Sequence, residues 1–230
     1  MEHRYKNIFI DEFSTHFRFT LIAVLLASGI IITLKLFVFK DSLSSEHESI
    51  FEGFFISHLF FAALTPSALF SKYRKLFFLG ILASILTSSV TCTLSDIIFP
   101  YLGATFLGYN MHFHVCIIEE PVLSWSFILI GAVLGFFLSS KVMSLTKYTH
   151  GLHIFISSFA AGMYLLTYGV SFLSMKALLF LPLLIISVLI PCVLNDIGVP
   201  SFLVRLNSTS DEERKKLRDE IHAQHHDHHH

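Results

Sequence analysis

Six long apolar segments, separated by short polar stretches, set the pattern of this 230-residue chain. A transmembrane helix needs about 20 mainly apolar residues. The pattern therefore predicts an all-α integral membrane protein that crosses the bilayer several times. The six predicted transmembrane helices cover residues 19–39, 50–70, 76–99, 122–140, 154–173 and 177–194.

The segment before the first apolar run has a different pattern. Phe9, Phe13 and Phe17 recur at four-residue spacing with charged residues between them. This spacing is typical of an amphipathic helix that lies on a membrane surface. We therefore predict a separate N-terminal segment over residues 1–18. It carries several charges and is followed by no small-residue cleavage site, so it does not resemble a secretory signal peptide.

Composition supports the membrane class and excludes one class of partner. Hydrophobic residues make up 53% of the chain and charged residues only 14%, against about 25% charged in a typical soluble domain. The formal net charge is -1, and the chain contains no basic run of the kind that binds nucleic acid. The expected partner is the lipid bilayer.

Basic residues predict the orientation, because Lys and Arg are enriched in cytoplasmic loops. They gather before the first predicted span, at 72–75, at 141–147 and after the sixth span. Both termini are therefore predicted to be cytoplasmic, in a bacterial inner membrane or its equivalent.

A short motif that occurs twice predicts an internal repeat. The sequence CTLSDIIFP at 92–100 returns as CVLNDIGVP at 192–200, with Asp96 and Asp196 at matching positions. His58 and His153 stand in a second, weaker match. Three spans per half require the halves to have opposite orientations, as in many transporters. We therefore predict two inverted three-helix halves at 19–110 and 111–203, followed by a charged tail at 204–230.

The matched carboxylates allow two interpretations. Asp is costly in hydrocarbon and normally faces a protein interior or a water-filled path. Asp96 would then lie near the outer face and Asp196 near the inner face. Alternatively, an Asp or Asn followed by Pro only caps or breaks the helix.

Histidine and carboxylate residues in and beside the outer loops are candidate metal ligands. Imidazole and carboxylate groups together suit zinc, iron, nickel, cobalt or manganese. In an extended segment, the two rings of a His-x-His pair point the same way. The alternative is an ordinary solvated polar loop. These outer candidates are His47, Glu48, Glu52, His112, His114, Glu119 and Glu120.

His58 falls about nine residues inside the second predicted span. An ionisable residue at that depth is expected to serve function. The alternative is a neutral buried imidazole that bonds to a serine or a carbonyl group of another helix. The three cysteines, Cys92, Cys116 and Cys192, form no CxxC pair. Cys92 and Cys192 lie in apolar segments, and we interpret these two as packing residues. Gly131 and Gly135 form a GxxxG motif, which indicates close helix packing.

Two further histidine groups are expected on the cytoplasmic side. His150 and His153 are three residues apart and would share a helix face, either as a chelate or as ordinary polar residues at a helix end. The tail is histidine-rich and suits loose binding of divalent metals. A purification tag would give a similar composition, although Asp227 interrupts the run. The tail candidates are His222, His225, His226, His228, His229 and His230.

Three functions fit this pattern. The first is a membrane transporter that moves a divalent transition-metal cation along a path lined by His, Glu and Asp, with protons as a candidate coupling ion. The second is an integral-membrane metalloenzyme whose metal is held at the outer surface by His112, His114 and either Glu119 or Glu120. The third is a non-catalytic membrane subunit or assembly factor. Transport is favoured, and the small size of the chain is compatible with a homo-oligomer.

Overall fold

The computed structural model describes residues 2–38, 44–74, 77–144, 146–170 and 177–195, and within these ranges the regular structure is helical. This agrees with the predicted all-α class. The helices are α1 (Glu2–Phe37), α2 (Ser44–Arg74), α3 (Phe77–Thr93), the π-helix η1 (Leu94–Ile98), α4 (Phe99–Phe106), α5 (Cys116–Glu119), α6 (Pro121–Phe137), α7 (Ser139–Ser144), α8 (Thr146–Tyr168) and α9 (Ala177–Val193).

Four helical stretches are long and apolar enough to cross a membrane. They are His16–Phe37, Glu46–Ser71, Phe77–Phe106 and Gly151–Tyr168. The other two predicted spans are also helical, but their apolar parts are shorter, at Pro121–Phe137 and Leu179–Val193. The chain is therefore an apolar helical protein of the membrane class, and four of its six predicted spans reach spanning length in the described residues.

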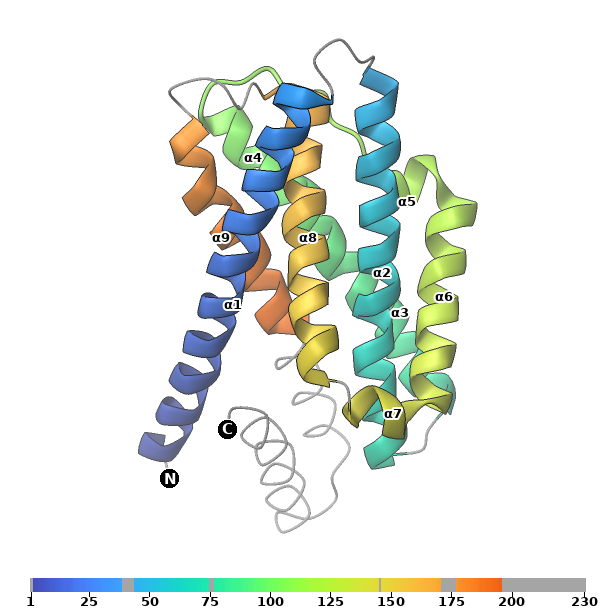
Figure 1. Ribbon diagram of the computed structural model, residues 1–230. Coiled ribbons are helices and arrows are strands. Elements are labelled where there is room, and N and C mark those ends of the chain that lie inside the picture. The colour runs from blue at the N-terminus through green and yellow to red at the C-terminus, as the bar shows by residue number, and fades with distance from the viewer. Residues whose placement is uncertain (1, 39–43, 75–76, 145, 171–176, 196–230) are drawn as a thin grey trace.

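The six apolar stretches run alternately up and down in one bundle (Figure 1). The start of α1, the end of α2 and α7 lie toward the bottom of the view, which we call the α7 end, whereas α9 ends higher in the view. The end of α1, the start of α2, the end of α4 and the end of α8 lie at the opposite end. Successive apolar helices therefore run in opposite directions.

The first helix differs from its prediction at the N-terminus. α1 runs without interruption from Glu2 to Phe37, so the predicted amphipathic segment and the first predicted span are one helix. The residues before Gly29 include neither glycine nor proline, which are the usual helix breakers. The proposed boundary at residue 18 is therefore not a break in the backbone.

α2 lies at the centre of the bundle and packs against both α6 and α8. Its contact with α6 explains the GxxxG motif. A Cβ atom added at Gly131 would collide with the carbonyl oxygen of Phe60, and one added at Gly135 would collide with that of Leu64. The two glycines allow the backbones of α2 and α6 to approach closely, as the sequence predicts.

The first copy of the repeated motif does not end a helix. α3, η1 and α4 follow one another directly and form the continuous apolar stretch Phe77–Phe106. Pro100 lies in the first turn of α4. It has no N–H to donate to the carbonyl group of Asp96, and the π-helical turn accommodates this loss. The expectation that Asp96 lies at the end of a span is corrected, because this residue lies in the interior of a long helix.

Candidate functional site

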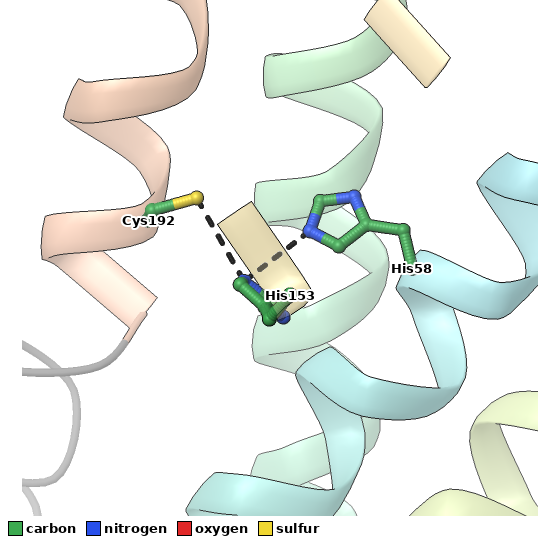
Figure 2. A group of neighbouring side chains, drawn as sticks. All are labelled: His58, His153 and Cys192. Atoms are coloured by element: carbon green, nitrogen blue, oxygen red, sulfur yellow. Dashed lines mark hydrogen bonds between the residues drawn. The ribbon is translucent and has the colours of Figure 1, made fainter. Parts of the chain in front are cut away.

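Three buried side chains converge between α2, α8 and α9. We call His58, His153 and Cys192 the His–Cys cluster (Figure 2). The Nε2 atoms of His58 and His153 are 3.3 Å apart. The Sγ atom of Cys192 lies 3.7 Å from Nε2 of His153. His58 and Cys192 are each only 2% exposed, and His153 is also buried.

Asp96 fixes the orientation of His58. Its Oδ2 atom lies 2.6 Å from Nδ1 of His58, and its Oδ1 atom accepts hydrogen bonds from Ser95 at 2.6 Å and Ser157 at 2.7 Å. Asp96 is completely buried. An ionised carboxylate can only accept hydrogen bonds, so Nδ1 of His58 must be the donor. In the neutral imidazole, Nε2 then carries the lone pair on the side of His153 and Cys192, as in metal sites whose histidine is held by a carboxylate.

Two of the three separations between these atoms fit one tetrahedral metal ion. Bonds of about 2.0–2.1 Å from zinc to nitrogen and about 2.3 Å to sulfur place two nitrogens about 3.3 Å apart and a nitrogen and a sulfur about 3.6 Å apart. The corresponding separations here are 3.3 Å and 3.7 Å, and all three candidate ligand atoms lie within 4.8 Å of one another. Three protein ligands would leave the fourth position open.

Asn195 connects α9 to the helices around this cluster. It is buried and lies three residues after Cys192. Its Oδ1 accepts a hydrogen bond from Thr91 at 3.4 Å, and its Nδ2 donates to the carbonyl oxygen of Ala62 at 3.5 Å. Pro66 has no N–H to bond that carbonyl within α2. The proline therefore leaves the carbonyl oxygen of Ala62 free of a helical partner, and Asn195, close to Cys192, donates to it.

A second group of candidate ligands lies at the junction of α2 with the segment after α4. We call Glu52, His114 and Cys116 the Glu–His–Cys cluster, because their ligand atoms lie within 4.8 Å of one another. Nδ1 of His114 lies 2.9 Å from Oε2 of Glu119, and the other oxygen of Glu119 accepts the backbone N–H of Val115 at 3.1 Å. The carboxylate of Glu119 thus holds His114 as Asp96 holds His58.

The thiol of Cys116 is neutral in this environment. Burial raises its pKa well above the usual range, and the nearby Glu52 carboxylate raises the pKa further. A metal ion would have to displace this proton to bind the sulfur, since the thiolate is the form that ligates metals.

One face of α8 connects the two clusters. His153 and Ser157 belong to the His–Cys end, and Tyr164 and Tyr168 lie on the same helical face further along. The hydroxyl of Tyr168 donates to Glu48 at 3.0 Å, and its ring stacks on His114 with 5.0 Å between ring centroids. On α2, Glu52 and His58 are six residues apart, or about 9 Å along the helix axis. The clusters therefore lie in series along the bundle.

The structure joins some predicted site residues and separates others. His58 and Asp96 meet, as do Glu52, His114 and Glu119. The rest of the outer candidates do not join a cluster in the described part of the chain. His112 and Glu120 are exposed, Glu48 bonds to Tyr168, and His47 is buried in the first turns of α2.

Of the inner candidates, His153 contacts His58 in the interior. The chelate of His150 with His153, which was one of two interpretations of this pair, stays a prediction. The side chain of His150 lies outside the described residues, as do Asp196 and the tail histidines His222, His225, His226, His228, His229 and His230.

Sequence reasoning missed the two cysteines. Cys192 was interpreted as a packing residue and Cys116 was given no role, yet each joins a cluster of candidate ligands. A signal for Cys116 was present, because His112, His114 and Cys116 alternate in a segment that is not helical before Cys116. Alternating side chains of an extended segment share one face. Cys192 had a weaker signal in its repeated position before an Asp.

Comparison with known proteins gives no family. No protein-family model matches the chain, and no curated protein or solved structure matches it. The functional argument therefore depends on the chemistry and geometry of the two clusters.

Proposed function

We propose that this protein transports a divalent transition-metal cation across a membrane, and that the His–Cys cluster is the binding site within the bilayer. The observation that carries the proposal is the convergence of two imidazole nitrogens and one thiol in the buried interior. His58 lies midway along the apolar stretch Glu46–Ser71. Polar groups at such depth are costly unless they are paired or bind a ligand.

The donor set narrows the class of metal. Thiolate ligands favour zinc and other soft or borderline ions, whereas magnesium, calcium and manganese prefer oxygen ligands. With Cys192 beside two histidines, zinc is the first candidate cation, and cobalt and nickel follow from the same donor chemistry. Manganese, which the sequence alone left open, is less well supported.

Transport is better supported than surface catalysis. The metalloenzyme hypothesis requires His112, His114 and Glu119 or Glu120 to converge on one metal, but His112 and Glu120 are exposed and belong to neither group of candidate ligands. Two clusters in series along α2 and α8 suit an ion that moves between sites. A subunit that only assembles with others would not need convergent imidazole and thiol groups.

We further propose six spans and two inverted halves. In support, Leu94 and Ser95 are π-helical, and so are Leu194 and Asn195 at the matching positions. An axis in the membrane plane that relates two halves brings equivalent residues near it together, which fits the contact between His58 and His153. The repeat assigns Asp196 the role of Asp96, so Asp196→Asn should reduce metal flux as Asp96→Asn does.

The orientation remains the one that the basic residues predict. The α7 end, with the start of α1 and the end of α2, would face the cytoplasm (Figure 1). Both termini would then be cytoplasmic, and the histidine-rich tail would buffer metal on that side.

The test is zinc uptake into vesicles that contain the purified protein. Cys192→Ser should abolish most zinc flux, because it replaces a thiolate ligand with a poor one. Cys92→Ser is the matched control, since Cys92 occupies the equivalent position of the repeat, is equally buried and lies outside both clusters. Zinc flux that is equal in the two variants would contradict the proposal.

A further inference from the structure

We infer that Glu52, His114 and Cys116 form a second metal site for a zinc-class cation, distinct from the His–Cys cluster. This site has its own histidine, its own thiol and its own orienting carboxylate. Its ability to bind a metal stands independently of transport. Its role as the first binding site along a transport path rests on the proposed function.

An unpartnered nitrogen inside the cluster points to a ligand. Nε2 of His114 is buried and has no hydrogen-bond partner among the described residues. The nearest carboxylate oxygen, from Glu52, lies 4.0 Å away, beyond hydrogen-bond distance. A buried polar atom without a partner costs about 1–3 kcal/mol. A metal between this nitrogen, Glu52 and Cys116 would remove that cost.

Two neighbours hold His114 in the orientation that ligation requires. Glu119 lies 2.9 Å from Nδ1, and as a carboxylate it requires Nδ1 to carry the proton. In the neutral imidazole, Nε2 then carries the lone pair and faces the cluster. The ring of Tyr168 stacks on the imidazole at a centroid distance of 5.0 Å, which limits its rotation. The same arrangement of histidine and carboxylate occurs around His58.

The second site differs from the first in access and rigidity. The side chain of Glu52 is 27% exposed, and that of Glu119 is 48% exposed, whereas the His–Cys cluster is fully buried. The Glu52 oxygen lies 4.0 Å from Nε2 of His114, so these two atoms must move closer to reach tetrahedral separations of about 3.3–3.6 Å. Glu52 can make this movement because it is partly solvent-exposed. We therefore expect weaker binding and faster exchange here than at the His–Cys cluster.

The three cysteines allow each site to be observed separately. Cobalt bound to a thiolate absorbs light through sulfur-to-metal charge transfer, and the histidine-rich tail cannot produce this signal because it contains no cysteine. We expect the purified full-length protein to bind two cobalt ions with thiolate character. Cys116→Ser should remove about half of the absorbance and Cys192→Ser the other half, whereas Cys92→Ser should remove none. A spectrum that Cys116→Ser leaves intact would overturn the inference.

A second variant tests the site without removing the thiol. Glu52→Gln keeps the shape of the side chain and removes its charge. It should lower the affinity of the Cys116-dependent cobalt signal by at least about tenfold. Glu46→Gln is the control, because Glu46 is exposed in the first turn of α2. Equal affinities in the two variants would exclude Glu52 as a ligand and contradict the site.

The outcomes for this site and for transport are distinguishable. Two thiolate-bound cobalt ions without zinc flux in vesicles would refute transport and support the second site. Zinc flux that depends on Cys192 but not on Cys116, together with a single thiolate-bound cobalt ion, would refute the second site and support transport.

Discussion

Replacing Asp96 with asparagine tests whether the buried carboxylate serves a metal or the fold. Oδ1 of the new amide can still accept the hydrogen bonds from Ser95 and Ser157. The amide nitrogen then faces Nδ1 of His58, which lies 2.6 Å from the carboxylate in the native protein. Two donors cannot bond, so the proton of His58 should move to Nε2. That nitrogen faces His153 and Cys192, and the proton would block metal binding there.

The expected loss of metal affinity in Asp96→Asn follows from this change in the tautomer of His58. Removing a carboxylate that orients a metal-binding histidine typically costs 10–100-fold in metal affinity, or about 1.4–2.8 kcal/mol. The metal-free protein should lose much less stability, because the two serine hydrogen bonds survive and a buried charge is removed. Asp96→Asn should therefore lower metal affinity strongly and lower the stability of the metal-free protein only slightly.

The assay combines cobalt titration of the purified protein with thermal unfolding in the absence of metal. Ser157→Ala, which removes one hydrogen bond to Asp96, should weaken cobalt binding less than Asp96→Asn does. Ser158→Ala is the matched control, because in the described part of the chain its hydroxyl bonds to the carbonyl of Ile154 in its own helix and not to Asp96. Unchanged cobalt affinity in Asp96→Asn, combined with a stability loss of about 1–3 kcal/mol, would show that the carboxylate serves folding and would refute the reasoning.

Three further predictions concern packing, topology and the tail. Gly135→Leu should destabilise the protein by at least about 1–3 kcal/mol, because a Cβ atom there collides with a carbonyl oxygen of α2. A Cβ atom at Gly29 meets no neighbouring atom within 4 Å, so Gly29→Leu should change thermal unfolding little. A cysteine at Asn110 should react with a membrane-impermeant reagent from outside the cell, and one at Ser208 only after permeabilisation; the reverse pattern would overturn the orientation. Deletion of residues 222–230 should alter the metal response of zinc flux and leave residual flux, and complete loss in a folded truncation would contradict a buffering role.

The helical architecture was largely predictable from the sequence. Long apolar runs can satisfy their backbone groups in a membrane only as helices or closed barrels, and their length indicated where helices lie. The close approach of α6 to α2 was also predictable, since Gly131 and Gly135 leave room for it. The separate N-terminal helix was not correct, because hydrophobicity changes at residue 18 while helix propensity does not.

Part of the candidate site was predictable and part was not. His58 and Asp96 were identifiable because ionisable groups are rare and costly in apolar segments. Cys192 was not identified, because a cysteine in an apolar segment is usually a packing residue. Cys116 was given no role, because the three cysteines form no CxxC pair. A cysteine can be recognised as a candidate metal ligand only when the structure shows a histidine beside it from another part of the chain.

The sequence by itself determined which residues could bind a metal ion and approximately where along the chain the helices lie. The tertiary structure alone decided which of them meet. His58 and His153 are 95 positions apart and in contact, while His112 and His114 are close in sequence and only His114 joins a cluster. The physical reason is that hydrophobicity specifies the length of each helix, whereas side-chain packing sets its rotation and its vertical offset against its neighbours. The π-helical turn before Pro100 shows this most directly, because it lets the helix continue beyond Asp96 and keeps the carboxylate beside His58.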